Sequence, residues 1–111
     1  MPTIRSLDPH AREAILRELT ELSARIVSEL GAEAVYLFGS LARGEQHEGS
    51  DIDLLVVANY PHRSLDLIGE ILRLTDLPVE PVVVRPATLE RRVRDGHPLL
   101  ARITAEAVRL A

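Results

Sequence analysis

The chain has 111 residues, of which 46% are hydrophobic and 27% are charged, a composition typical of a single globular domain. Its formal net charge is −4, so no overall positive field would attract nucleic acid, and direct nucleic-acid binding is not expected. The basic residues are all arginine, which excludes a P-loop NTPase because that class needs a phosphate-binding lysine. Cysteine is absent, which excludes disulfides and thiolate metal sites.

The chain carries no signal for membrane association. Residues 1–8 lack the apolar core of a signal peptide, and the longest apolar runs, such as residues 54–58, are too short to span a bilayer. We therefore expect a cytoplasmic protein made of one domain, residues 1–111. The sequence is compatible with either a monomer or an oligomer.

Helix and strand signals alternate along the chain. Asp8 and Pro9 form an N-cap and a first-turn proline, and Gly31 ends the helical spacing of apolar residues that follows them. Pro81 lies inside a predicted strand and predicts an edge position or a bulge, because proline donates no ladder hydrogen bond. The first half of the chain is expected to contain a helix over 9–30, a strand over 34–38, one or two helical turns over 41–45, a loop over 45–50 and a strand over 51–58. The second half is expected to contain a helix over 65–75 capped by Ser64, a strand over 79–85, and a short helix that is capped by Thr88 and ends before Gly96. A last helix begins at Pro98 and includes Ala107 and Leu110.

This order predicts an α+β fold, αβαβαβ in its central part, with a small mixed sheet and helices packed on it. The strand over residues 51–58 is the clearest because it is dense in Ile, Leu and Val.

Two aspartates at the start of that strand are the first candidates for chemistry. Asp51 and Asp53 are two residues apart, so their side chains point to the same face of the strand, while Ile52 and Leu54 point to the opposite face and into the core. Two carboxylates this close repel each other unless a cation lies between them. Their oxygens suit Mg²⁺, which also binds substrate phosphates, and a metal pair would activate an attacking hydroxyl and stabilise a leaving pyrophosphate.

A glycine and a serine at the end of the preceding strand are candidates for binding phosphate. Gly39 lets the backbone approach a phosphate closely, and the hydroxyl of Ser40 adds a donor. Arg43 is compatible with two roles: it contacts a phosphate, or it pairs with Asp51 or another local acid. If the two strands are neighbours, these groups lie beside the metal-binding aspartates.

A third acid is expected on another strand. Glu80 is the candidate, because it shares a face with Val82 and Val84 in the same acid-then-apolar pattern as Asp53 and the residues after it. It would bind a metal and help to deprotonate the acceptor hydroxyl. A solvated edge residue is the alternative interpretation.

At these positions the sequence resembles the DNA polymerase β-like nucleotidyltransferase superfamily, whose signature is Gly-Ser, about ten spacer residues, and Asp-x-Asp. Here ten residues, 41–50, separate Ser40 from Asp51. The segment 37–57 is similar to the minimal nucleotidyltransferase (MNT) branch, and the likeness in length and element order covers nearly the whole chain. One departure is that the third family carboxylate is usually Asp, whereas this chain has Glu80 followed by Pro81.

The resemblance implies that Gly39 and Ser40 bind the triphosphate and that Asp51 and Asp53 bind Mg²⁺. Many MNT proteins are antitoxins that transfer AMP from ATP to a tyrosine of a HEPN-domain toxin. We therefore expect AMPylation of a HEPN-type partner. The alternatives are a non-catalytic antitoxin or adaptor that masks its partner by binding, and a nucleotidyltransferase that acts on a small molecule.

Overall fold

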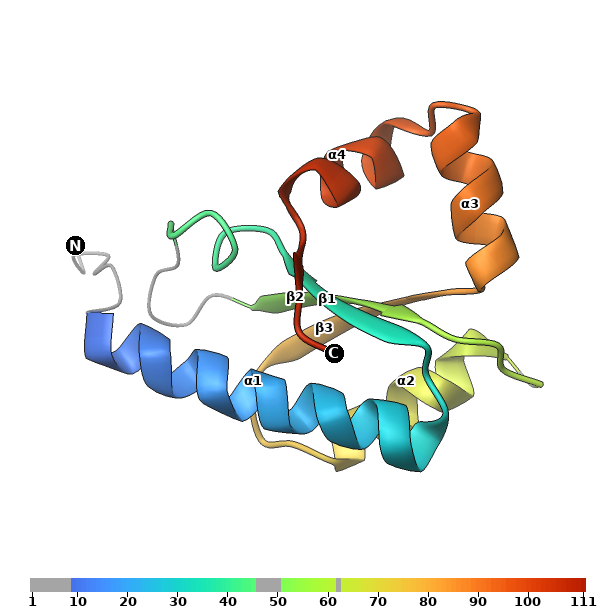
Figure 1. The fold of residues 1–111 in the computed structure, drawn as a ribbon. Coiled ribbons are helices and arrows are strands. Elements are labelled where there is room, and N and C mark those ends of the chain that lie inside the picture. The colour runs from blue at the N-terminus through green and yellow to red at the C-terminus, as the bar shows by residue number, and fades with distance from the viewer. Residues whose placement is uncertain (1–8, 46–50, 62) are drawn as a thin grey trace, which may run out of the picture.

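The computed structural model describes residues 9–45, 51–61 and 63–111 of the chain. The expected cap at Asp8 and most of the expected loop over 45–50 lie outside these residues. The helices and strands are α1 (Pro9–Leu30), β1 (Ala34–Phe38), β2 (Ile52–Val57), α2 (Ser64–Arg73), β3 (Val79–Val84), α3 (Pro86–Arg94), α4 (Pro98–Glu106) and β4 (Val108–Arg109) (Figure 1). Within the described ranges, no helix is both long and apolar enough to cross a membrane.

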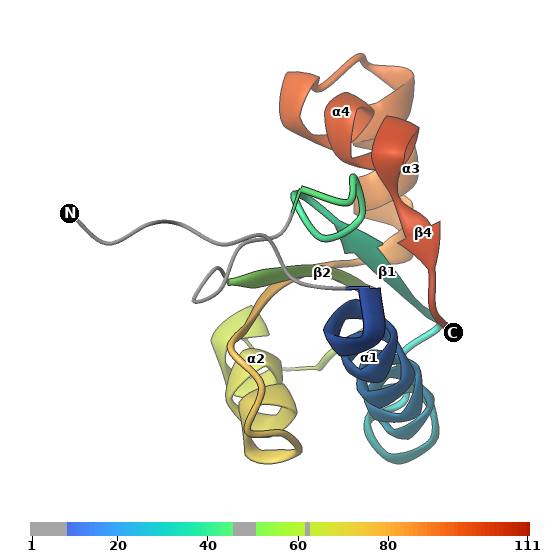
Figure 2. The same ribbon diagram turned by 90° about the vertical axis from the view of Figure 1, so that its left-hand side faces the viewer.

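The four strands form one mixed sheet in the order β3-β2-β1-β4. β1 pairs antiparallel with both β2 and β4, whereas β2 and β3 are parallel. α1 and α2 cover one face of the sheet, and α3 and α4 lie on the other side (Figure 2). The structure therefore confirms the expected α+β fold with a small mixed sheet.

The alternation of side chains along β2 divides the core into two parts. Ile52, Leu54 and Val56 are buried in a cluster with residues of α1 and α2. Leu55 and Val57 are buried on the opposite face, in a smaller cluster with Leu100 and Ile103 of α4. Each fully buried aliphatic side chain contributes about 1.5–3 kcal/mol to folding. Because Asp53 alternates with Leu54, it shares the face that α4 covers.

The strand that contains Pro81 lies at an edge of the sheet, as its sequence predicts. β3 pairs only with β2 among the described strands, with Leu54 opposite Pro81. An edge position leaves one side of β3 without a ladder partner, so the missing N–H of proline disturbs no second ladder.

Two helix starts differ from the expectation. α2 begins at Ser64 itself, with Arg63 at the N-cap position, so Ser64 is not the cap. α3 begins at Pro86 with Arg85 at the N-cap position, so Thr88 lies inside the helix. The reason in α3 is that a proline has φ preset for the first helical position and needs no N–H partner there.

The expected one or two helical turns over residues 41–45 are present as a single turn, which does not extend into a helix. The N–H of Arg43 donates to Gly39 O at 3.1 Å, and that of Glu45 donates to Ser40 O at 2.8 Å. Gly44 has a φ of +75°, a value at which a helix cannot continue. The segment is therefore a compact turn that follows β1.

The last helix is shorter than expected. α4 ends at Glu106, Ala107 is extended, and β4 pairs with β1. The N–H of Leu110 then donates to Val35 O at 2.8 Å. The expectation that Ala107 and Leu110 continue the helix is therefore wrong. The C-terminal segment pairs with the edge of β1 that β2 does not occupy, and these ladder hydrogen bonds replace the helical ones.

Candidate active site

The two candidate metal-binding aspartates lie where β2 begins. Asp53 is in β2, opposite Phe38 of β1 and alongside Glu80 of β3. Asp51 precedes the strand and is exposed, whereas Asp53 is half-buried. Strand neighbours in register point to the same side of a sheet, so Asp53 and Glu80 lie on one face.

The environment of Asp53 disfavours its charged form. Burial raises the pKa of Asp53, and the negative charge of Asp51 raises it further. The guanidinium of Arg43 lowers the pKa of Asp53, which opposes these effects in part, while the charge of Glu106 adds to them. A bound cation would remove the cost of charging Asp53, so the two aspartates present the electrostatics of a cation site.

Gly39 brings the turn after β1 against this carboxylate. Its φ is +78°, which favours glycine because a side chain is rarely accommodated there. A Cβ built on Gly39 would overlap Asp53 Oδ2 and stand 3.1 Å from Asp53 Cγ. The absence of a side chain at Gly39 therefore lets the turn and the acidic strand meet, which confirms that the two parts of the motif are neighbours.

Arg43 is held by two carboxylates of the described chain. Its Nε donates to Glu45 at 2.9 Å and its Nη1 donates to Glu106 at 2.9 Å. These contacts raise the pKa of Arg43, with Glu45 having the larger effect. Of the two roles that the sequence left open, the structure shows pairing with acids: Glu45 is a local acid, and Glu106 comes from the end of α4.

Two residues at this site were not found from the sequence. Glu106 accepts a hydrogen bond from the N–H of Gly39 at 3.1 Å as well as pairing with Arg43. Arg12 of α1 donates from Nη2 to Leu41 O at 3.1 Å and so supports the turn from the helix beneath the sheet. Neither residue belongs to a motif, and both contacts join segments far apart in the sequence, so no local signal identifies them.

The donor set fits a hard divalent cation that keeps part of its hydration. Asp51 and Asp53 provide carboxylate oxygens, which is what Mg²⁺ takes from proteins when substrate phosphates and water complete its coordination. Glu80 is exposed on the neighbouring strand. Among the described residues, no three Asp, Glu or His side chains converge closely enough to hold a metal ion by themselves. Ligation by Glu80 remains a prediction.

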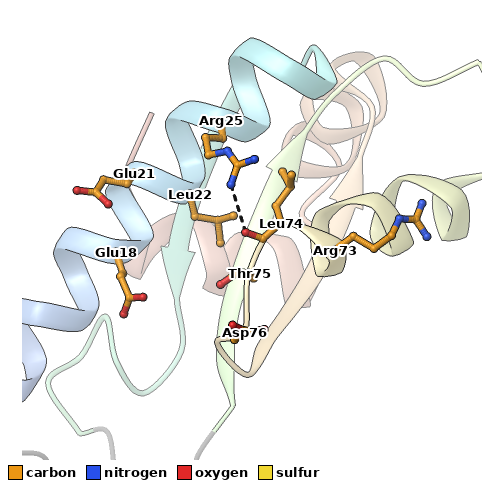
Figure 3. Close-up of a pocket in the computed structure, with 8 residues that line it drawn as sticks. All are labelled: Glu18, Glu21, Leu22, Arg25, Arg73, Leu74, Thr75 and Asp76. Carbon is orange, nitrogen blue, oxygen red and sulfur yellow. Dashed lines mark hydrogen bonds between the residues drawn. The ribbon is translucent and has the colours of Figure 1, made fainter.

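A hollow elsewhere on the molecule carries a different set of side chains. It has a volume of about 320 Å³ and lies between α1 and the segment that joins α2 to β3 (Figure 3). Arg25 donates to Leu74 O across it at 3.5 Å and pairs with Glu29 of its own helix. The hollow lies on the face of the sheet that α1 and α2 cover, opposite α4. It is therefore separate from the candidate site at Asp51 and Asp53.

The mixed sheet, the glycine-serine turn and the acidic strand beside it define a nucleotidyltransferase class of domain. The chain belongs to the nucleotidyltransferase domain family, whose family model matches residues 19–110. This family generally uses a nucleoside triphosphate and a divalent metal.

Several known proteins are similar to this chain. It is 35% identical over 78 residues to the "Putative protein adenylyltransferase" of Methanocaldococcus jannaschii; the match covers 63% of this chain and about half, 52%, of that protein. It is 30% identical to a "putative minimal nucleotidyltransferase" of known structure, with a TM-score of 0.60, and the match covers 91% of this chain and 98% of that one. A complex of the tri-AMPylated Shewanella oneidensis HEPN toxin with its MNT antitoxin contains a chain with the same fold, at 17% identity and a TM-score of 0.50, with 90% of this chain and 71% of that one covered.

Proposed function

We propose that this chain is a Mg²⁺-dependent nucleotidyltransferase that transfers AMP from ATP to a HEPN-domain toxin and thereby acts as an antitoxin. The observation that carries the proposal is the packing of Gly39 against the carboxylate of Asp53. This contact lies between the turn that we propose to bind phosphate and the acidic strand, and nucleotide transfer needs such groups side by side.

The reaction assigns a role to each part of the site. A hydroxyl oxygen of the acceptor attacks the α-phosphorus of ATP, the bond from that phosphorus to the bridging oxygen breaks, and pyrophosphate leaves with the electron pair. Mg²⁺, when bound, neutralises the phosphate charge and lowers the pKa of the attacking hydroxyl. Asp51 and Asp53 would hold the ion, while Ser40 and Arg43 would hold the phosphates.

Glu80 is the group proposed to accept the proton of the attacking hydroxyl. It is exposed, so it can reach a bound acceptor, and it lies in register with Asp53 on the adjacent strand. A carboxylate in this position can bind metal or act as the base. Its extra methylene relative to aspartate gives it a longer reach from the edge strand.

The nature of the acceptor is supported by the relatives. A similar protein is named a protein adenylyltransferase, and a structure with the same fold contains an AMPylated HEPN toxin beside an MNT antitoxin. The substrate and partner of those proteins are carried to this chain as part of the proposal. The net charge of −4 argues against a polynucleotide acceptor.

Mass spectrometry of a candidate HEPN-domain partner protein tests the proposal. After incubation with this chain, ATP and Mg²⁺, the partner should gain mass in multiples of one AMP, and the Asp53→Asn variant should give no gain. The matched control is Asp76→Asn, an exposed aspartate between α2 and β3, which should act like wild type. A stable complex that silences the toxin without ATP and without a mass gain would instead establish masking by binding.

A further inference from the structure

Glu106 contacts the turn after β1 at two points, and none of the roles given above uses it. Its Oε1 accepts from the N–H of Gly39 at 3.1 Å, and its Oε2 accepts from Arg43 Nη1 at 2.9 Å. Its side chain is only 20% exposed, compared with 63% for Glu45, the other acid bound to Arg43. One carboxylate therefore connects the backbone at the beginning of the turn with a side chain four residues later.

The fold delivers Glu106 to this place through the C-terminal strand. β4 pairs antiparallel with β1, so that Tyr36 is opposite Arg109 and Leu37 is opposite Val108. Continuing the same register by two residues places Gly39 opposite Glu106. α4 ends at Glu106, and its buried residues hold it against the sheet. Glu106 is thus fixed from both sides, by a helix and by a strand.

The contacts leave Arg43 able to bind a ligand. A guanidinium has five N–H donors in one plane, and the bonds to Glu45 and Glu106 use one donor on Nε and one on Nη1. The remaining donors can meet a phosphate in the forked geometry that arginine favours. The direction in which they point depends on the carboxylates that hold the other side of the guanidinium.

We infer that Glu106 is a positioning residue for the nucleotide, which holds the Gly39 peptide in place and aims the guanidinium of Arg43 at the triphosphate. The inference rests on the proposed function, because it assumes that the turn binds the phosphates of ATP. Glu106 acts through Arg43 and does not touch the substrate. It also links the C-terminal segment, α4 and β4, to the nucleotide site.

A double-mutant cycle of Glu106→Gln and Arg43→Ala, read out by calorimetric titration with ATP and Mg²⁺, tests this inference. Glutamine keeps an acceptor for the Gly39 N–H but loses the ion pair with Arg43. Glu106→Gln should raise the Kd for ATP by about three- to tenfold in the wild-type background, since close charged pairs couple at this level. In the Arg43→Ala background, Glu106→Gln should change the Kd for ATP by less than about twofold, because the guanidinium that Glu106 positions is absent.

Two controls separate positioning from folding. Glu70→Gln makes the same chemical change at an exposed residue of α2, on the other face of the sheet, and should leave ATP binding unchanged. The thermal midpoint of Glu106→Gln should stay within about 2–4 °C of wild type, because Arg43 is partly exposed at 41% and glutamine keeps the acceptor for the Gly39 N–H. In the transfer reaction, the KM for ATP should rise while kcat changes much less.

Four outcomes would overturn the inference. Tighter ATP binding by Glu106→Gln would mean that Glu106 competes with phosphate, and equal effects with and without Arg43 would mean that it acts only on the structure. Unchanged binding would remove its role while the proposed function survives. A wild-type chain that binds no ATP in the presence of Mg²⁺ would overturn the proposed function together with the inference.

Discussion

The backbone of Gly39 and the carboxylate of Asp53 occupy adjoining space, so that a Cβ on Gly39 would overlap Asp53 Oδ2. Gly39 directly follows β1 and Asp53 is the second residue of β2, and the antiparallel pairing of these strands brings them together. The contact couples the shape of the turn to the position of the acid, and several consequences can be measured.

Gly39→Ala should destabilise the fold and abolish nucleotide binding. The backbone conformation at φ +78° costs about 1–2 kcal/mol for a residue with a Cβ, and displacement of Asp53 adds to this cost. Gly44→Ala is the matched control, since Gly44 has a φ of +75° but nothing within 4 Å of an added Cβ. Denaturant unfolding should therefore show the larger loss for Gly39→Ala. Equal losses for the two variants would mean that the contact with Asp53 has no cost.

Asp53→Asn should stabilise the protein at neutral pH although it removes activity. The pKa of Asp53 is raised in the folded state, mainly by burial and then by Asp51, so the charged form is a cost to folding above that pKa. The cost disappears as the pH falls below the unfolded pKa of about 3.9, where the carboxyl is protonated in both states. Thermal melts should show a gain of a few degrees, roughly 2–4 °C, at neutral pH and none in acid. A gain of the same size in acid would contradict this explanation.

Mg²⁺ should stabilise the wild-type protein and not the Asp53→Asn variant. A cation that binds only the folded state raises the thermal midpoint, and the rise grows with the logarithm of its concentration once that exceeds the Kd; the cation also removes the repulsion between Asp51 and Asp53. The measurement is a series of melts at increasing Mg²⁺, with EDTA as the metal-free reference. An identical rise in the variant would place the ion at another site.

Glu80→Gln should slow transfer more than it weakens ATP binding. If Glu80 accepts the proton of the attacking hydroxyl, its loss should lower kcat by roughly 100-fold or more. Glu90→Gln in α3 is an exposed control that should keep full activity. Full activity of Glu80→Gln would show that transfer does not need Glu80 and that Asp51 and Asp53 are the only carboxylates of the three that it requires.

Ile103→Ala should lower the free energy of unfolding by about 2–4 kcal/mol, as expected for a large aliphatic side chain that is 2% exposed. Leu99→Ala, in the same helix but exposed, should change it by less than about 0.5 kcal/mol. Urea unfolding of the two variants provides the comparison. Similar values would mean that α4 is not anchored through Ile103.

The part of the fold that the sequence predicts well is the part with strong local patterns. α1 follows from the helical spacing that stops at Gly31, and β2 follows from its run of aliphatic residues. The alternation of side-chain direction predicts that Ile52 and Leu54 point into the core, which their burial confirms, and it puts Asp53 on the opposite face of β2. These features depend on residues close in sequence.

The parts that could not be predicted depend on contacts between distant segments. β4 has only two residues, and it forms because one edge of β1 is available for pairing. In the sequence, Ala107 and Leu110 keep the spacing of a helix, so the local pattern indicates a helix there. The contact of Glu106 with Gly39 spans 67 residues. A local pattern cannot report such a contact, since it depends on the strand register that brings the C-terminal segment back to the turn.

The most direct test of the central claim is to follow label from two forms of ATP, radiolabelled at the α-phosphate or at the γ-phosphate, into the HEPN-domain partner. Nucleotide transfer predicts that the partner takes up the α-label and not the γ-label, that pyrophosphate is released in equal amount, and that Asp53→Asn abolishes uptake. Uptake of the γ-label would indicate phosphoryl transfer. Absence of both labels, despite ATP binding and a stable complex, would contradict the enzymatic account.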